Sequence, residues 1–158
     1  MIDLIYNFDK LDNFDDLLPE NVEIAFTNGC YDILHSGHVS IFKYCKTLAD
    51  FVVVGINSDT SVTRLKGLLR PIVDQQQRAQ VVASVRYVDM VVIFSEDTPY
   101  NLIKAVQPDY LVKGGDYQES EVVGHDLVPH TKIFPLIENL GTTNIVEKIV
   151  HRYCKKEC

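Results

Sequence analysis

The sequence predicts an α/β fold with three layers, in which helices cover both sides of a mostly parallel sheet of about five strands. Strand-like apolar runs alternate with amphipathic helical stretches along the 158 residues. This alternation is typical of parallel strands joined by right-handed helical crossovers. Two of the runs, Phe51–Ile56 and Met90–Phe94, are apolar almost throughout, as expected for strands buried on both faces. Together these features indicate a Rossmann-like α/β/α domain.

The chain divides into one domain and two short flanking segments. We expect residues 1–21 to form an N-terminal extension packed on the domain, residues 22–153 to form the domain, and residues 154–158 to form a polar tail. In the extension, apolar residues between Leu11 and Leu18 alternate with aspartates, which predicts a short amphipathic helix. The sequence contains no internal repeat and no second domain.

Five strands and four helices are expected within the domain. The strands cover residues 22–27, 51–56, 90–94, 110–112 and 132–134. The helices cover residues 38–49, 74–85, 98–106 and 142–153, and a long polar loop joins Ser58 to Asp74. Asp74 and Thr98 are suitable N-cap residues. The last helix has an apolar face, which we expect to point inward, made of Ile145, Val146, Ile149 and Val150.

Composition excludes several functional classes. The formal net charge is −7, from 15 basic and 22 acidic side chains, so a nucleic-acid surface is not expected. No apolar run reaches the ~18 residues of a membrane-spanning helix. The acidic N-terminus lacks the basic start of a signal peptide. Four cysteines without Cys-x-x-Cys spacing favour reduced thiols in a cytoplasmic protein, and no metal site formed by side chains is expected.

The segment His35-Ser36-Gly37-His38 carries the strongest functional signal. It lies where a strand-like run gives way to a helix, and it places two imidazoles around a glycine. A helix start offers unpaired N–H groups and the positive end of the helix dipole, which bind anions. Every other polar motif also follows a predicted strand, and ligands of parallel sheets bind at that edge. The pattern predicts an enzyme that handles a nucleoside triphosphate.

Here the chain resembles the HxGH nucleotidyltransferases, the cytidylyltransferase-like superfamily. Within it the chain is most similar to the adenylyltransferase domain that acts on D-glycero-β-D-manno-heptose 1-phosphate in ADP-heptose synthesis. The resemblance runs from about Ala25 to Val150. Besides the histidine segment, it rests on stretches at residues 26–32, 57–62, 65–67, 70–71, 77–78, 112–117 and 142–145.

The resemblance implies that AMP passes from ATP to a sugar 1-phosphate with release of pyrophosphate, by direct in-line attack. It also implies Mg²⁺ accompanying ATP, and a homodimer. ATP is favoured over CTP because Ile137–Gly141 lacks the arginine usual in glycerol 3-phosphate cytidylyltransferases. Three alternatives stay open: a CTP-dependent cytidylyltransferase on glycerol 3-phosphate or another phosphorylated alcohol, a catalytically silent nucleotide-binding module, and a purely structural α/β protein. Relatives often carry a sugar kinase in the same chain. The 158 residues of this chain leave no room for one, so we expect the kinase reaction to be carried out by another protein.

The same resemblance assigns the candidate site residues. His35, His38, Lys66 and Arg78 are the catalytic candidates. Nucleotide binding is expected at Thr27, Asn28, Gly29, Tyr31, Asp32, Gly37, Lys113, Gly114, Gly115, Asp116, Gly141, Thr142 and Thr143. Acceptor binding is expected at Asn57, Asp59 and Lys46.

Several of these assignments have a structural alternative. Arg78 could instead pair with Asp74 one turn earlier, and Asp59 could cap the following segment. Asp32 could organise its own loop, and Lys46 could be solvated on its helix. At Gly141, relatives often have a serine, so one hydroxyl is missing from this chain.

Overall fold

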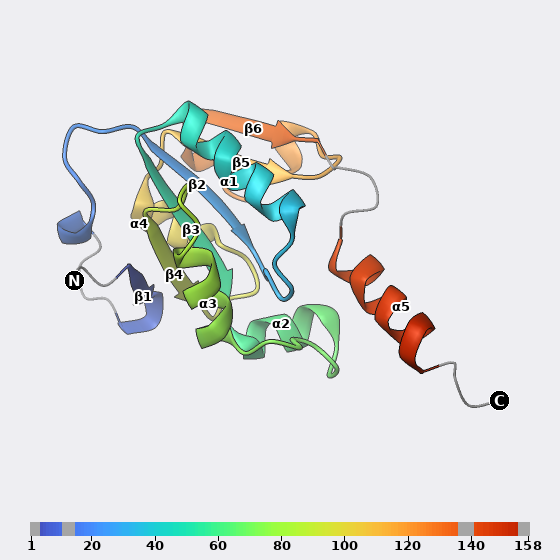
Figure 1. Ribbon diagram of the computed structural model, residues 1–158. Helices are drawn as coiled ribbons and strands as arrows, with labels where there is room; N and C mark the ends of the chain where they lie inside the picture. The colour runs from blue at the N-terminus through green and yellow to red at the C-terminus, as the bar shows by residue number, and fades with distance from the viewer. Residues whose placement is uncertain (1–3, 11–14, 136–140, 155–158) are drawn as a thin grey trace.

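The computed structural model describes residues 4–10, 15–135 and 141–154. It confirms the α/β class and the three layers (Figure 1). The six strands are all parallel and lie in the order β1-β4-β3-β2-β5-β6. Their bounds are Ile5–Asn7, Ile24–Gly29, Phe51–Asn57, Met90–Phe94, Tyr110–Gly114 and His130–Phe134 for β1 to β6.

The strand beyond the expected five comes from the N-terminal extension. β1 pairs with β4 in parallel, with Ile5 opposite Val91, so the extension adds an edge strand to the sheet. The expected helix in this extension lies partly outside the described residues, and its described part, Asp15–Leu17, is a single 3₁₀ turn.

Five α-helices connect or follow the strands. They are α1 to α5, at Ser36–Leu48, Asp59–Lys66, Gln75–Ala83, Tyr100–Val106 and Thr142–Tyr153. α3 begins as expected, because the Asp74 carboxylate accepts hydrogen bonds from the N–H groups of Gln76 and Gln77, both at 3.0 Å. No described helix is long and apolar enough to cross a membrane.

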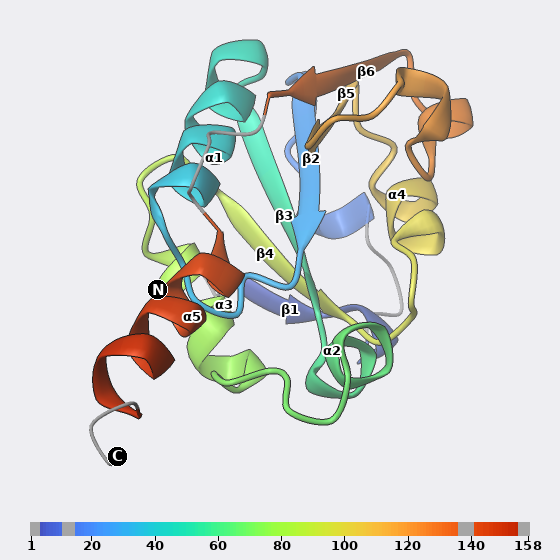
Figure 2. The same cartoon turned by 90° about the vertical axis from the view of Figure 1, so that its right-hand side faces the viewer.

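The core consists of two apolar layers, one on each face of the sheet. α1 and α3 cover one face and α4 covers the other, as the two views show (Figures 1 and 2). Alternation along β3 supplies both layers, because Val52 and Val54 pack on the α1 face and Val53 packs on the α4 face. All three valines are fully buried, as expected for a central parallel strand.

α2 replaces most of the expected long loop. The Ser58 hydroxyl caps it by accepting a hydrogen bond from the N–H of Ser61 at 3.3 Å. Ser61 and Val62 are buried, so tertiary packing stabilises a segment whose sequence is too polar to predict as a helix. The remaining loop runs only from Gly67 to Val73.

α5 has the expected bounds but not the expected packing. None of its residues is buried, and the helix projects away from the sheet (Figure 1). Ile149 and Val150 keep 48% and 47% of their surface exposed. The inward orientation expected for these side chains is therefore wrong.

The strand order places a switch point beside β2. The chain continues from β2 to β3 on one side, whereas β5 lies on the other. Crossovers that leave in opposite directions open a crevice at the carboxyl ends of the two strands, and ligands bind there in open α/β sheets.

Candidate functional site

The two histidines lie at the start of α1, above this crevice. His35 is the N-cap residue, with an extended backbone and no capping hydrogen bond from its side chain. The two imidazole rings stack with their centroids 3.7 Å apart and their planes 24° apart. The ring of Tyr31 meets the His38 ring edge-on at 5.0 Å. Burial of Tyr31 therefore fixes one side of the His38 ring.

Both imidazoles are neutral near pH 7 in the unliganded protein. Burial lowers the pKa of His35. Burial, with a smaller contribution from neighbouring His35, lowers the pKa of His38 to about 4. The Nδ1 atoms of both rings are buried and find no hydrogen-bond partner among the described residues. A proton on Nε2 can be donated to a ligand, whereas a proton on Nδ1 has no acceptor.

Two adjoining cavities open beside the histidines. The larger has a volume of about 560 Å³ and the smaller about 280 Å³. They share one wall, formed by Asn28, Gly29, Tyr31, His38, Lys113 and Thr142. The smaller cavity also contacts Thr27, His35, Gly37, Gly114 and Gly141. The structure thus brings together most of the residues expected at the nucleotide.

β5 passes close to α1 at Gly114. A Cβ atom on Gly114 would lie 2.5 Å from Cδ1 of Ile41, so a side chain at this position would require the end of the Ile41 side chain to move. At Gly141, a Cβ atom would lie 2.9 Å from Oδ1 of Asn144. In this chain Asn144 therefore occupies space that a serine at position 141 would need.

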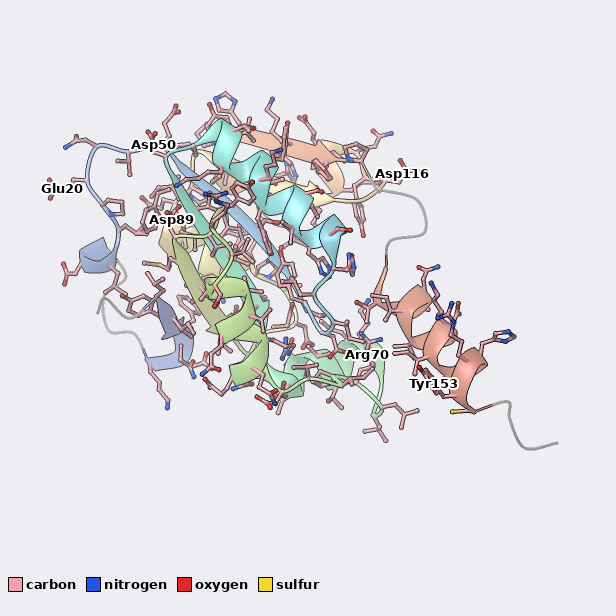
Figure 3. All side chains as sticks on the ribbon, viewed as in Figure 1. Glu20, Asp50, Arg70, Asp89, Asp116 and Tyr153 are labelled. Carbon is pink, nitrogen blue, oxygen red and sulfur yellow. The ribbon has the colours of Figure 1, made fainter. Side chains whose placement is uncertain are left out.

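Three cationic side chains reach the cavities. Lys113 lies on β5 and lines both cavities, and burial lowers its pKa. Lys66, the last residue of α2, lines the larger one. Arg70 lines the same cavity, and Figure 3 shows it in the loop beyond α2. Sequence reasoning missed Arg70 as a site residue, although Arg70-Pro71 was one of the stretches that carry the resemblance.

Asp32 organises the loop that carries Arg70. Its buried carboxylate accepts hydrogen bonds from Nε of Arg70 and from the N–H groups of Ile72 and Val73, the last two at 2.8 and 2.9 Å. Of the two roles considered for Asp32, the structure favours loop organisation. The residue still lines the larger cavity.

Arg78 is a structural cation in this fold. Its side chain is fully buried and donates hydrogen bonds to three groups: the carbonyls of Val73 and Cys30, and the Asp59 carboxylate at 2.7 Å. With no exposed surface it cannot touch a substrate, so we correct its catalytic assignment to a positioning role. The alternative pair with Asp74 is not among the described ion pairs, although the Arg78 charge adds to the hydrogen bonds from Gln77 in lowering the pKa of Asp74, whose carboxylate caps α3.

Two further candidates, Lys46 and Asp59, lie away from the cavities. Nζ of Lys46 bonds to Oδ2 of Asp89 at 2.7 Å and to the Asp50 carbonyl at 2.6 Å. Figure 3 places Asp50 and Asp89 at the end of the sheet opposite Arg70. Lys46 therefore cannot bind the acceptor at the crevice. Asp59 pairs with Arg78, and Ser58, not Asp59, caps α2.

The remaining residues behave as follows. Gly115 and Asp116 line neither cavity, and Asp116 is exposed. Asn57 and Thr143 line the larger cavity. Ile137–Leu140, part of the segment whose missing arginine favours ATP over CTP, lies outside the described residues. The part of the chain that the structure describes contains no group of three His, Cys, Asp or Glu side chains able to hold a metal ion.

Comparison with known proteins found similar sequences. A family model described as cytidylyltransferase-like matches residues 26–146. The bifunctional protein HldE of Wolinella succinogenes is 54% identical over 127 residues, which cover 80% of this chain and 27% of that protein. The Helicobacter pylori protein of the same name is 52% identical over the same shares of both chains. The chain thus spans just over a quarter of the length of these curated relatives.

Solved structures share the fold. The lipopolysaccharide core biosynthesis protein of Thermoplasma volcanium superposes with a TM-score of 0.62 at 25% identity, covering 73% of this chain and 97% of the other. Pantothenate synthetase of Thermus thermophilus gives 0.59 at 14% identity, covering 93% and 72%. The second similarity concerns the fold alone.

Proposed function

The chain belongs to the cytidylyltransferase-like family, and we propose from this premise that it is an adenylyltransferase that moves AMP from ATP to a sugar 1-phosphate of the heptose type. One observation carries the proposal. Two neutral imidazoles stacked at a helix start line the smaller cavity together with Lys113, at the switch point of a parallel sheet. Such a wall offers donors and a cation to a chain of phosphates.

The two cavities suit two substrates that react where they meet. The smaller cavity, which both histidines, Gly37 and Lys113 line, suits the nucleotide with its phosphate chain, and the larger suits the acceptor. An oxygen of the acceptor phosphate attacks the α-phosphorus, the bond from that phosphorus to the bridging oxygen breaks, and pyrophosphate leaves with the electron pair. No covalent enzyme intermediate is required, so the side chains act by positioning and by stabilising charge.

The polar and cationic residues that line the two cavities have definite parts in this reaction. The Nε2–H groups of His35 and His38 donate to phosphate oxygens, as do the unpaired N–H groups at the start of α1. Lys113, Lys66 and Arg70 compensate the charge of the triphosphate and the acceptor phosphate within a protein of net charge −7. Thr142 and Thr143, at the start of α5, provide a second set of donors. Mg²⁺ enters with ATP as part of the substrate.

Two further expectations belong to this proposal. A homodimer is expected from the resemblance and would be measured by light scattering during size-exclusion chromatography. A cytoplasmic location is expected because ATP and reduced thiols occur together there.

A substrate matrix tests the proposal. ATP, CTP, GTP and UTP are each combined with heptose 1-phosphate, other sugar 1-phosphates and glycerol 3-phosphate, and pyrophosphate release is measured. We expect the highest rate with ATP and heptose 1-phosphate. Release only with CTP and glycerol 3-phosphate would establish the cytidylyltransferase alternative. Nucleotide binding without release in any combination would identify a silent module.

A further inference from the structure

Tyr31 combines a rare backbone conformation with burial, in the loop between β2 and α1. Its φ angle is 48°, in the left-handed region that a bulky side chain seldom adopts. The other described non-glycine residues with a positive φ, Asn21 and Gln107, line neither cavity. Tyr31 lines both cavities, although only 5% of its surface is exposed. Strained backbone is concentrated at functional sites, so the ring of Tyr31 is placed there at an energetic cost.

The chain is anchored on both sides of Tyr31. The carbonyl group of Cys30 accepts a hydrogen bond from Nη1 of the buried Arg78. The carboxylate of Asp32 accepts hydrogen bonds from two backbone N–H groups of the loop beyond α2, at 2.8 and 2.9 Å. A strained conformation persists only where its surroundings impose it. These hydrogen bonds hold the residues before and after Tyr31 and impose its conformation.

The Tyr31 ring packs against two residues on one face of α1. Its centroid lies 5.0 Å from that of the His38 ring, with the planes 80° apart, and 5.2 Å from that of the Phe42 ring. His38 and Phe42 are four residues apart, so they are neighbours on the helix surface. Phe42 is fully buried, and the hydroxyl end of Tyr31 lies near the buried Thr27 of β2. Tyr31 therefore joins the end of β2 and the core to the histidine turn.

His38 lacks the hydrogen bond that usually orients an imidazole. Such a ring is normally fixed by a hydrogen bond at one nitrogen while the other nitrogen acts on the ligand. Nδ1 of His38 is buried and has no hydrogen-bond partner among the described residues, and the same holds for the neighbouring His35. His35 is thus not itself held at Nδ1, whereas the ring of Tyr31 is held by the core. Aromatic rings at a steep angle to one another also have a preferred mutual orientation.

We propose that Tyr31 is a positioning residue for His38, whose ring takes the place of the missing Nδ1 hydrogen bond and keeps Nε2 presented to the cavities. The strained backbone places the ring, Phe42 supports it, and His38 receives its orientation from it. The catalytic consequence rests on the proposed function, in which His38 donates to the triphosphate. The ring contact itself is tested independently of that reaction.

Nuclear magnetic resonance titration of His38 in the unliganded protein tests the contact. Tyr31→Leu removes the aromatic ring, Tyr31→Phe keeps it, and His38→Gln assigns the resonance. Tyr44→Leu is the matched control, because Tyr44 also lies on α1 but packs on Phe134, with ring centroids 5.4 Å apart, and lines neither cavity.

The titration has a definite expected result. The His38 pKa, about 4 in wild type, should rise by about one unit or more in Tyr31→Leu, because a loosened ring becomes more hydrated. In Tyr31→Phe and Tyr44→Leu it should stay near the wild-type value. The titratable groups that face His38 besides Tyr31, namely His35 on its own turn and Lys113 across the smaller cavity, are retained in every variant.

Steady-state kinetics with ATP and heptose 1-phosphate tests the consequence for the reaction. In Tyr31→Leu we expect kcat to fall about tenfold or more, because a misplaced donor is lost mainly from the transition state, with the KM for ATP within about twofold of wild type. Tyr31→Phe should recover most of the lost kcat, since the ring is restored.

The outcomes separate positioning from packing and from the reaction. A His38 pKa that stays at its wild-type value in Tyr31→Leu, or rises equally in Tyr44→Leu, would refute the positioning role. A raised KM with unchanged kcat would also refute it and assign Tyr31 to nucleotide binding. If wild type releases no pyrophosphate, the proposed function fails and the titration alone decides the role of Tyr31. Circular dichroism checks folding, and if Tyr31→Leu does not fold, Tyr31→Met fills the same space with a flexible apolar chain and is titrated instead.

Discussion

At the scale of single residues, burial decides the chemistry of the histidines. Two imidazoles near neutral pH could be charged or neutral, and the sequence did not distinguish these states. In the structure, the stacked rings and the buried Nδ1 atoms make the neutral form the stable one. In the proposed reaction the histidines therefore donate to the triphosphate through neutral N–H groups, and Lys113, Lys66 and Arg70 carry the positive charge.

This state predicts a pH-dependent stability. The pKa of His38 is about 4 in the folded protein and about 6.5 in an unfolded chain. The unfolded state therefore binds the proton first as the pH falls. The contribution of His38 to the free energy of unfolding is fully present above pH 6.5. This free energy falls by about 2–3 kcal/mol as the pH decreases from 6.5 to 4.

Urea denaturation of wild type and His38→Gln at pH 7 and pH 4.5 measures this effect. We expect the free energy of unfolding of wild type to fall by about 2–3 kcal/mol more than that of the variant. Equal losses in both proteins would show that the His38 pKa is not lowered.

Two cations that looked alike in the sequence should differ in their effect on stability. Arg78→Ala removes three hydrogen bonds of a fully buried side chain, so we expect a loss of about 3 kcal/mol or more. Lys46→Ala breaks a partly exposed pair with Asp89 and should cost about 1 kcal/mol or less. Thermal denaturation compares the two. Similar losses would contradict the assignment of Arg78 as the buried positioning residue.

Sequence reasoning located residues at and beyond the carboxyl ends of β2 and β5, because parallel strands bring these ends together. It found His35, His38, Asn28 and Lys113 in this way. It did not find Arg70 or Glu121. These residues lie in connecting segments, and the sequence does not reveal the course of those segments past the cavity. It also misjudged Arg78. The sequence shows a cation in the first turn of a helix, but it does not show whether a neighbouring loop buries that side chain.

At the scale of elements, the apolar pattern of the sequence predicted where helices and strands lie along the chain better than it predicted how they pack. β4 has the expected bounds because its five apolar residues are buried on both faces. α2 was missed because few of its residues are apolar and its stability comes from the Ser58 cap and from the buried residues Ser61 and Val62. α5 was found with the expected bounds, yet its apolar face is half exposed, because amphipathicity says which face is apolar and not what covers it.

The exposed face of α5 predicts a small contribution to stability. Ile149→Ala removes a side chain that is already 48% exposed, so we expect a loss below about 1 kcal/mol. Val82→Ala in α3, which is fully buried, should cost about 1–3 kcal/mol. Urea denaturation at low protein concentration compares them. A larger loss for Ile149→Ala than for Val82→Ala would show that α5 packs against the domain.

At the scale of the whole molecule, three cationic side chains of this acidic protein line one crevice, namely Lys66, Arg70 and Lys113. The sheet order β1-β4-β3-β2-β5-β6 brings the ends of β2 and β5 together, and the starts of α1 and α5 face the same cavities. The alternation of strands and helices predicted the three layers and the parallel sheet, but not the order of the strands. The edge strand β1 was not predicted, because three residues are too short a run to separate a strand from an extended segment.

The turnover of His38→Ala with ATP and heptose 1-phosphate tests most directly whether the histidine turn performs the transfer. Circular dichroism establishes that the variant is folded, and pyrophosphate release gives kcat. We expect kcat to fall by ~10²–10³, as for the loss of one donor that stabilises transition-state charge, with the fold retained. A folded His38→Ala protein that keeps more than about a tenth of wild-type turnover would place the chemistry elsewhere in the molecule.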